Sequence, residues 1–187
     1  LRRMLARVEG MPLEALEAGG EWGWSSFGDY LDTLERAGAG INAGFLVGHS
    51  AIRRAVMGEA AVGGKATDKQ IGELSALLAE SLRAGGLGLS SGRTPVHKDW
   101  EGAPVPSFHA TDEELVALCR TVREHAWTNL EFAPSLAEFA STGDTMTAMS
   151  LAAHRSITWN RLTINPQNTE RTPPQLALSD RPAPTAP

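Results

Sequence analysis

The amino-acid sequence predicts an α/β fold built around a parallel sheet. Short apolar runs bounded by glycine recur along the chain, and such runs are typical of strands buried on both faces. The longer segments between them carry apolar residues at the spacing of a helix. Strands that alternate with helices imply parallel βαβ units. Each expected strand ends in polar or glycine residues, where α/β proteins commonly place their chemistry.

The first half of the chain predicts five helices and one strand. Ser26 can cap the third helix, because its hydroxyl can accept from an otherwise unpaired backbone N–H. Thr67 and Gln70 form a capping box that opens the fifth, since each side chain can satisfy the other's backbone N–H. The expected helices are 1–9, 12–18, 26–36, 51–57 and 68–84, and the expected strand is 41–47, a short and nearly apolar run.

The second half predicts three more strands and two more helices. Thr111 and Glu114 form a second capping box, which opens a helix after the long polar loop at 91–110. The expected strands are 87–90, 128–132 and 157–164, and helical segments are expected from 111 and over 135–153. Beyond a body of residues 1–166, the proline-rich segment 167–187 is expected to be a disordered tail, because its prolines cannot propagate a helix or a strand.

Composition excludes several classes of protein. The 187-residue chain has a formal net charge of −5, which argues against a general nucleic-acid binder. No apolar run approaches the roughly 20 residues that span a bilayer, and the first residues lack the apolar core of a secretory signal. The single cysteine, Cys119, can form neither an internal disulfide nor a cysteine zinc cluster. We therefore expect a cytoplasmic protein without nucleic-acid or membrane partners, and its first residue, Leu1, suggests a longer reading frame.

The segment that follows the second strand is the richest in reactive side chains. Residues 88–92 match the G-x-S-x-G pattern, but a polar loop with Pro95 follows in place of a helix, which argues against a serine-hydrolase elbow. Arg93 can hold a carboxylate with both arms of its guanidinium or, alternatively, anchor the long loop. His49 directly follows a buried strand, so its ring is expected at the rim of the sheet, with a structural role as the alternative. The histidines lack the H-x-H and H-E-x-x-H spacings of metal sites.

Six stretches of the chain together carry a family resemblance: 22–27, 30–32, 47–53, 56–58, 87–93 and 111–118. In this combination they resemble amidohydrolase family 3, which holds the D-aminoacylases, or N-acyl-D-amino-acid deacylases. The resemblance covers roughly residues 8–165. It implies a (β/α)8 TIM-type barrel, of which this chain would supply about four βα units. It also implies a zinc centre at the carboxyl ends of the strands, where a metal-bound water attacks an amide carbonyl and an aspartate shuttles the proton.

The chain departs from the family where the family binds metal. The H-x-H of the first barrel strand and the Asn-Cys-Gly segment are both absent, and Cys119 does not match the cysteine of that segment. The strand at 128–132 has no histidine, although a metal ligand of the family lies there. Neither a metal ligand nor a catalytic residue can therefore be carried over. Four residues match family motif positions and are expected to bind substrate at the rim: His49, Arg53, Ser91 and Arg93.

The sequence thus predicts the central part of a zinc-dependent amidohydrolase that hydrolyses C–N bonds of N-acyl amino acids or similar linear amides. Zinc is expected in the complete protein and not on this chain, which we expect to be inactive alone. Self-association through open barrel edges is also expected. Two alternatives remain open: a non-catalytic amidohydrolase-like binding protein, and a degenerate reading frame whose register departs from the family at Gln167.

Overall fold

A four-stranded parallel sheet forms the centre of the molecule. The computed structural model describes residues 2–19, 23–38, 40–135, 137, 139–160, 166–167 and 169–180. Within this part of the chain the strands lie in the order β1-β2-β3-β4, and each pairs in parallel with the next. The predicted α/β class with parallel βαβ units is therefore confirmed. The strands are β1 (Val47–Gly48), β2 (Gly88–Gly92), β3 (Asn129–Ala133) and β4 (Ile157–Trp159).

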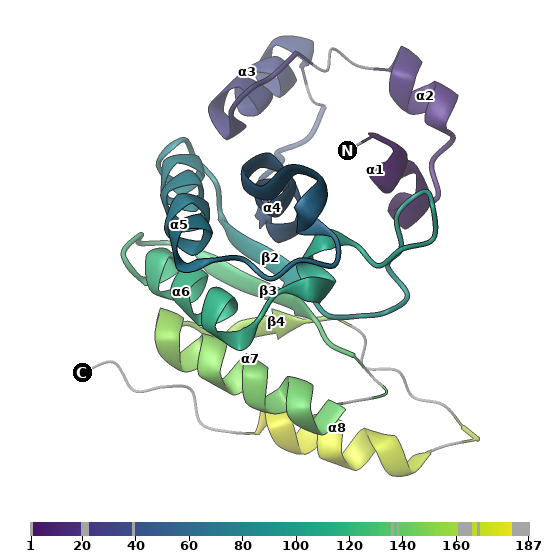
Figure 1. Cartoon of the computed structure of the whole chain (residues 1–187), viewed down its shortest axis with the longest axis vertical. Helices are drawn as coiled ribbons and strands as arrows, with labels where there is room; N and C mark the ends of the chain where they lie inside the picture. The colour runs from purple at the N-terminus through teal and green to yellow at the C-terminus, as the bar shows by residue number, and fades with distance from the viewer. Residues whose placement is uncertain are drawn as a thin grey trace.

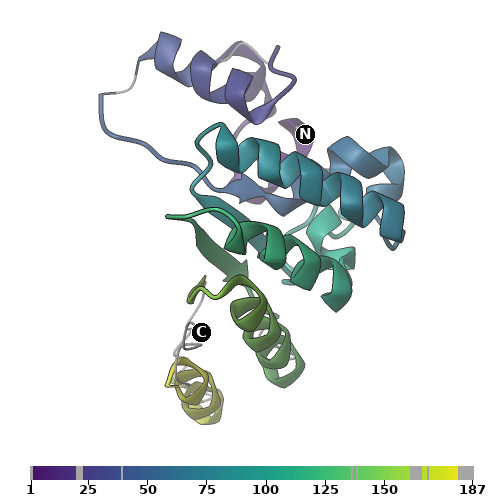
Figure 2. The same cartoon turned by 90° about the vertical axis from the view of Figure 1, so that its left-hand side faces the viewer.

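Helices cover one face of this sheet. Figures 1 and 2 show α5, α6 and α7 side by side along that face, in the same order as the strands that they connect. Three further helices precede β1. One short 3₁₀ helix, η1, follows α4, and another, η2, lies in the loop between β2 and α6. The helices are α1 (Arg2–Glu9), α2 (Leu13–Ala18), α3 (Phe27–Ala37), α4 (His49–Met57), η1 (Gly58–Ala61), α5 (Asp68–Arg83), η2 (Pro106–His109), α6 (Asp112–Arg123) and α7 (Phe139–Ala153).

The two faces of the sheet differ in polarity, because successive side chains of a strand point to opposite sides. Val47, Leu89 and Leu130 occupy one level of the register, are buried, and belong to the same core cluster as leucines of α5 and α6 and methionines of α7. One residue further along, Ser90 pairs with Glu131, and both side chains remain partly exposed. At these two levels the helix-covered face is thus apolar, and the opposite face is polar.

The first predicted strand is shorter than expected. Residues 41–46 lie outside the strand, and Ile41 is 80% exposed. Only Val47 and Gly48 form β1, although Leu87 N–H still donates to the Phe45 carbonyl at 2.8 Å. The prediction of a strand buried on both faces is therefore wrong for 41–46. The physical reason is position: β1 is an edge strand with β2 as its neighbour, so little of its flanking run is covered.

Local capping was predicted well. Ser26 Oγ accepts from the Asp29 N–H, and Thr67 forms a reciprocal capping box with Gln70, as expected. Thr111 also caps its helix by accepting from the Glu114 N–H at 3.3 Å. The Glu114 side chain, however, turns into the core instead of completing a second capping box.

The segment expected to be a disordered tail contains helical structure. Residues Thr169–Arg171 form η3, and Thr172–Ser179 form α8, whose Leu178 packs against the core. Pro173 and Pro174 lie in the first turn of α8, where a missing backbone N–H costs no helical hydrogen bond. The prediction that these prolines exclude a helix is therefore wrong for α8. Residues 181–187 lie outside the described residues, and so do residues 161–165 of the fourth predicted strand. The boundary at residue 166 stays a prediction.

No helix in the described part of the chain is both long enough and apolar enough to cross a membrane.

Candidate functional site

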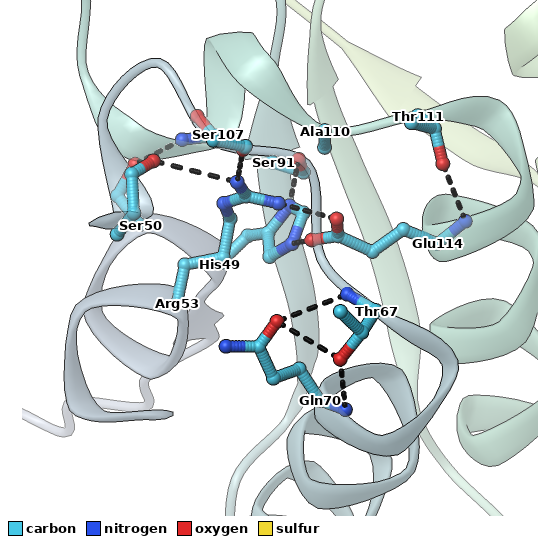
Figure 3. A network of polar contacts seen from close by, with 12 residues as sticks. His49, Ser50, Arg53, Thr67, Gln70, Ser91, Ser107, Ala110, Thr111 and Glu114 are labelled. Atoms are coloured by element: carbon cyan, nitrogen blue, oxygen red, sulfur yellow. Dashed lines mark hydrogen bonds and ion pairs between the residues drawn. The ribbon is translucent and has the colours of Figure 1, made fainter. Parts of the chain in front are cut away.

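Three of the four predicted site residues meet at the carboxyl ends of β1 and β2. His49 begins α4 directly after β1, Ser91 lies near the end of β2, and Arg53 lies one turn further along α4. Figure 3 shows their side chains converging on Glu114, which projects from the first turn of α6. One hydrogen-bonded group, which we call the His49 network, is formed by His49, Arg53, Ser91 and Glu114.

His49 is the centre of this network. Its Nδ1 lies 2.8 Å from Ser91 Oγ, and its Nε2 lies 2.7 Å from Glu114 Oε1. An ionised carboxylate only accepts hydrogen bonds, so Nε2 carries the proton and Nδ1 of the neutral ring accepts from the Ser91 hydroxyl. The residue is 1% exposed, and this burial lowers the pKa of His49. The His49 ring lies at the strand end as predicted, but inside the protein and not at an exposed rim.

Glu114 is held as a buried carboxylate. Burial alone would raise the pKa of Glu114, but hydrogen bonds from His49 and Arg53 outweigh that effect and hold it below its ordinary value. Arg53 Nη1 donates to Glu114 Oε2, and neither side chain of the pair is exposed. A buried charge is tolerated when it is paired and hydrogen-bonded in this way. This role of Glu114 is not evident from the sequence, because the capping-box pattern already accounts for a glutamate at this position.

Arg53 lies in the core and not at the rim. Its guanidinium donates from Nη2 to the Gly64 carbonyl at 2.7 Å, in addition to its ion pair with Glu114. These contacts join α4, the segment after η1, and α6. With an exposed fraction of 0%, the side chain cannot reach a ligand in this structure, so the expectation of a rim position is wrong for Arg53. Glu114 supplies the partner that makes the burial of the guanidinium possible.

Arg93 forms its hydrogen bonds outside the His49 network and anchors the loop that follows β2. Its Nη1 forms an ion pair with Asp112 Oδ1 at 2.6 Å, and its Nη2 donates to the Ala110 carbonyl at 2.7 Å. Thr145 of α7 completes the group, with its hydroxyl 3.3 Å from Arg93 Nη1 and 3.0 Å from Asp112 Oδ1. Of the two roles that the sequence left open, the structure shows loop anchoring directly. Binding of a substrate carboxylate by Arg93 stays a prediction.

A pocket of about 530 Å³ opens beside Arg93. It lies at the carboxyl ends of β2 and β3, the end at which α/β barrels bind their ligands. Its wall combines charged, hydroxyl and apolar side chains, namely Arg93, Pro95, Phe108, Ala110, Asp112, Glu113, Ser135, Ala137, Ser141 and Thr142. Asp112 is not recognisable as a site residue from the sequence, where it is one of several acidic residues in the first turn of a helix.

The described residues do not provide a metal site. Within them, no group of three or more His, Cys, Asp or Glu side chains has the arrangement to hold a metal ion. Cys119 is buried in α6, where burial raises the pKa of its thiol to about 12, so it carries no thiolate at neutral pH. The described residues therefore do not fit a zinc ion on their own.

The polar face of the sheet carries a further contact that the sequence analysis did not anticipate. Asn160, just after β4, donates from its Nδ2 to Glu131 Oε1 of β3. The pair lies on the same strand face as Ser90, opposite the helices. Strand register places these residues together, and register cannot be deduced from an isolated strand pattern.

Two deacylases are among the curated proteins that are similar to the chain. D-aminoacylase from Alcaligenes xylosoxydans xylosoxydans is 35% identical over 114 residues, which are 61% of this chain and 21% of that protein. N-acyl-D-aspartate deacylase from the same organism is 32% identical over 115 residues, 62% of this chain and 21% of that protein. An uncharacterized protein of Mycobacterium tuberculosis is 29% identical over 142 residues, 71% of this chain and 23% of that protein. No protein-family profile matches the chain.

Solved structures agree with the sequence comparisons. A crystal structure of D-aminoacylase, described as defining a novel subset of amidohydrolases, superposes with a TM-score of 0.67 at 26% identity, over 89% of this chain and 33% of that one. A D-aminoacylase mutant in complex with 100 mM CuCl2 gives the same values. The predicted partial amidohydrolase barrel is therefore confirmed. The chain is D-aminoacylase-like in sequence and fold, and it spans about a fifth of the length of the curated deacylases that it matches.

Proposed function

We propose that this chain forms part of an amidohydrolase that hydrolyses the C–N bond of N-acyl amino acids or similar linear amides. The observation that carries this proposal is the 35% identity to D-aminoacylase, which extends over 61% of the chain. The pocket beside Arg93 supports it, because it lies at the end of the sheet where barrel enzymes hold their substrates. The chain would then supply one sector of the active-site rim.

The pocket suits an N-acyl amino acid in its chemistry. Phe108 and Pro95 provide apolar wall for an acyl chain, and Arg93 provides a cation for the carboxylate. Asp112 and the Ala110 carbonyl already occupy the two arms of the Arg93 guanidinium, so a substrate carboxylate would have to compete with one of them or approach the partly exposed remainder of the group. In this proposal Arg93 orients the substrate, and Asp112 keeps the guanidinium in place when the pocket is empty.

We assign zinc to the complete enzyme and not to this chain. The D-aminoacylase mutant similar to the chain was solved in complex with CuCl2, which supports a metal cofactor in such a protein. Because the described residues do not fit a metal ion, no step of the reaction is derived through zinc here. We expect this chain by itself to be inactive toward amides.

Hydrolysis by the protein encoded by the whole surrounding reading frame tests this function. That protein should release acetate from N-acetyl amino acids when zinc is supplied, and chelation should abolish the release. Substitution Arg93→Lys should lower kcat/KM about ten- to a hundredfold, because lysine lacks the planar fork that binds a carboxylate twice. Arg123, exposed on α6, provides the matched Arg→Lys control. A zinc-loaded protein without hydrolytic activity would contradict the enzyme and favour the second candidate.

The second candidate is a non-catalytic amidohydrolase-like binding protein. It is favoured by one observation: β3 carries Glu131 and Phe132, and no histidine, where the family has a metal ligand. Such a protein would bind N-acyl amino acids without hydrolysing them.

Self-association is also proposed. Among the described residues the sheet has two edge strands, β1 and β4, and an edge strand can pair with a strand of another chain. We expect the isolated chain to sediment as a dimer or larger species. We also propose that the protein resides in the cytoplasm, in keeping with its single cysteine. A sharp monomer in sedimentation velocity would contradict the open-edge proposal.

A further inference from the structure

We propose that Ser91 is an activated hydroxyl nucleophile, with His49 as its base, and that it accepts acyl or phosphonyl groups from reactive electrophiles. This activity is separate from the metal-dependent hydrolysis proposed above. It rests on the chain of contacts in the His49 network, in which a hydroxyl, an imidazole and a carboxylate follow one another within hydrogen-bonding distance (Figure 3).

The geometry satisfies the requirements for an activated serine. Ser91 Oγ lies 2.8 Å from His49 Nδ1, the distance at which a base can take the hydroxyl proton. Glu114 Oε1 lies 2.7 Å from the other ring nitrogen and fixes both the tautomer and the orientation of the ring. Serine proteases use the two ring nitrogens in the opposite order. The order is not essential, because protonation at either nitrogen gives the same delocalised imidazolium.

The surrounding charges keep both partners in the reactive state. Arg53 is paired with Glu114, so the carboxylate stays ionised and can stabilise the imidazolium that forms when His49 takes the proton. The buried ring of His49 is neutral at neutral pH and therefore free to act as a base. The network thus holds a neutral base between a hydroxyl and a fixed anion.

The position of Ser91 distinguishes it from its neighbour Ser90. The two are adjacent in β2, so their side chains point to opposite faces of the sheet, and only that of Ser91 points toward His49. The G-x-S-x-G pattern of the sequence is centred on Ser90, which is therefore the wrong serine for this chemistry. Ser91 lies near the carboxyl end of its strand, the end at which α/β sheets bind ligands, and its side chain, on the helix-covered face of the sheet, is only partly buried.

The covalent step balances without another cofactor. With a fluorophosphonate as electrophile, a bond forms between Ser91 Oγ and phosphorus while the P–F bond breaks. The hydroxyl proton passes to His49 Nδ1, fluoride leaves, and the proton is later released to solvent. With an activated ester, a bond forms between Ser91 Oγ and the acyl carbon while the ester C–O bond breaks. The leaving alkoxide takes the proton from His49 and departs as an alcohol.

A biotinylated fluorophosphonate tests the proposal on the full chain, in buffer that contains EDTA so that metal-dependent chemistry cannot contribute. Peptide mass mapping should locate the label on Ser91. The label should disappear in Ser91→Ala and persist in the matched control Ser90→Ala. In His49→Gln, whose amide can still donate to Glu114 but cannot accept a proton as a base, labelling should be about a hundredfold slower.

Unfolding provides a second comparison that does not depend on whether His49→Gln folds. Urea-unfolded wild-type chain contains the same serines without the His49 contact, so its Ser91 should react at the slow rate of an ordinary hydroxyl. Absence of label on Ser91 in the folded wild type would overturn the proposal. Equal reactivity of Ser91 and Ser90, or equal labelling of folded and unfolded chains, would overturn it as well.

Discussion

Glu114 at the start of α6 holds His49 at the end of β1, with 2.7 Å between Glu114 Oε1 and His49 Nε2. The two residues are 65 positions apart in the chain, and both side chains are fully buried. Arg53 binds the second carboxylate oxygen, so one glutamate joins the first βα unit to the helix after the second strand. This relationship makes Glu114 the residue on which the geometry of the His49 network depends.

Replacing Glu114 by glutamine should destabilise the fold strongly. The substitution leaves the Arg53 guanidinium buried without its counterion, and breaking a buried pair from one side costs about 3–5 kcal/mol. Urea unfolding monitored by circular dichroism measures the change. Glu80→Gln, at an exposed position of α5, is the matched control and should shift the free energy of unfolding by no more than about 0.5 kcal/mol. Equal effects of the two substitutions would contradict the role of Glu114.

Stability should fall as the solution becomes acidic. Burial lowers the pKa of His49 from 6.5, so below about that pH the unfolded chain binds a proton that the native state resists. The pKa of Glu114 is also below its ordinary 4.5, which adds a second loss as the pH falls through that range. In both cases the unfolded state binds more protons, so the free energy of unfolding decreases with falling pH.

Urea midpoints measured from neutral pH to about pH 5 check the first of these transitions. His49→Gln should flatten the dependence between about pH 7 and pH 5. His109→Gln is the comparison, because the pKa of His109 is also lowered by burial and contributes in the same range. A midpoint that does not change with pH in the wild type would contradict the buried, neutral state of His49.

Arg93→Lys should separate loop anchoring from substrate binding. Lysine keeps the charge near Asp112 but cannot also reach the Ala110 carbonyl in the same geometry, so the free energy of unfolding should drop by about 1 kcal/mol. If Arg93 also binds the substrate carboxylate, affinity for an N-acyl amino acid should fall by about tenfold or more, beyond any loss of folded protein. Loss of stability with unchanged affinity would leave Arg93 with the anchoring role alone.

Zinc should not remain on the purified chain. The described residues lack a group that could hold the ion, and the sequence lacks the paired histidines of the family. Elemental analysis after dialysis should therefore find much less than one zinc per chain. One tightly held zinc would contradict the assignment of the ligands to other parts of the complete protein.

Local interactions made the order of elements predictable, whereas long-range contacts determined the site. The caps at Ser26 and Thr67 involve neighbours within three or four residues, and the sequence pattern therefore located their helices correctly. Glu114 belongs to a similar local pattern at Thr111, yet its carboxylate prefers partners on a distant helix. No local pattern shows whether a glutamate in the first turn completes a capping box or binds side chains of a distant helix.

Burial accounts for the remaining differences. Arginine is usually a surface residue. Arg53 lies in the core because the folded chain brings the carboxylate of Glu114 next to it. Residues 41–46 have the composition of a strand but lie beside an edge of the sheet. In α8 the two prolines occupy the one part of a helix that tolerates them. Each difference arises from position in the fold and not from the residue types themselves.

The proposed function requires the pocket beside Arg93 to bind N-acyl amino acids through their carboxylate. Titration of the isotope-labelled chain with an N-acetyl-D-amino acid, followed by nuclear magnetic resonance, tests it most directly. Signals of Arg93, Asp112 and Thr142 at the pocket should shift and saturate, and the matched N-acetyl-D-amino acid amide, which lacks the carboxylate, should bind at least about tenfold more weakly. Equal binding of the acid and the amide, or shifts confined to residues outside the pocket, would contradict the claim.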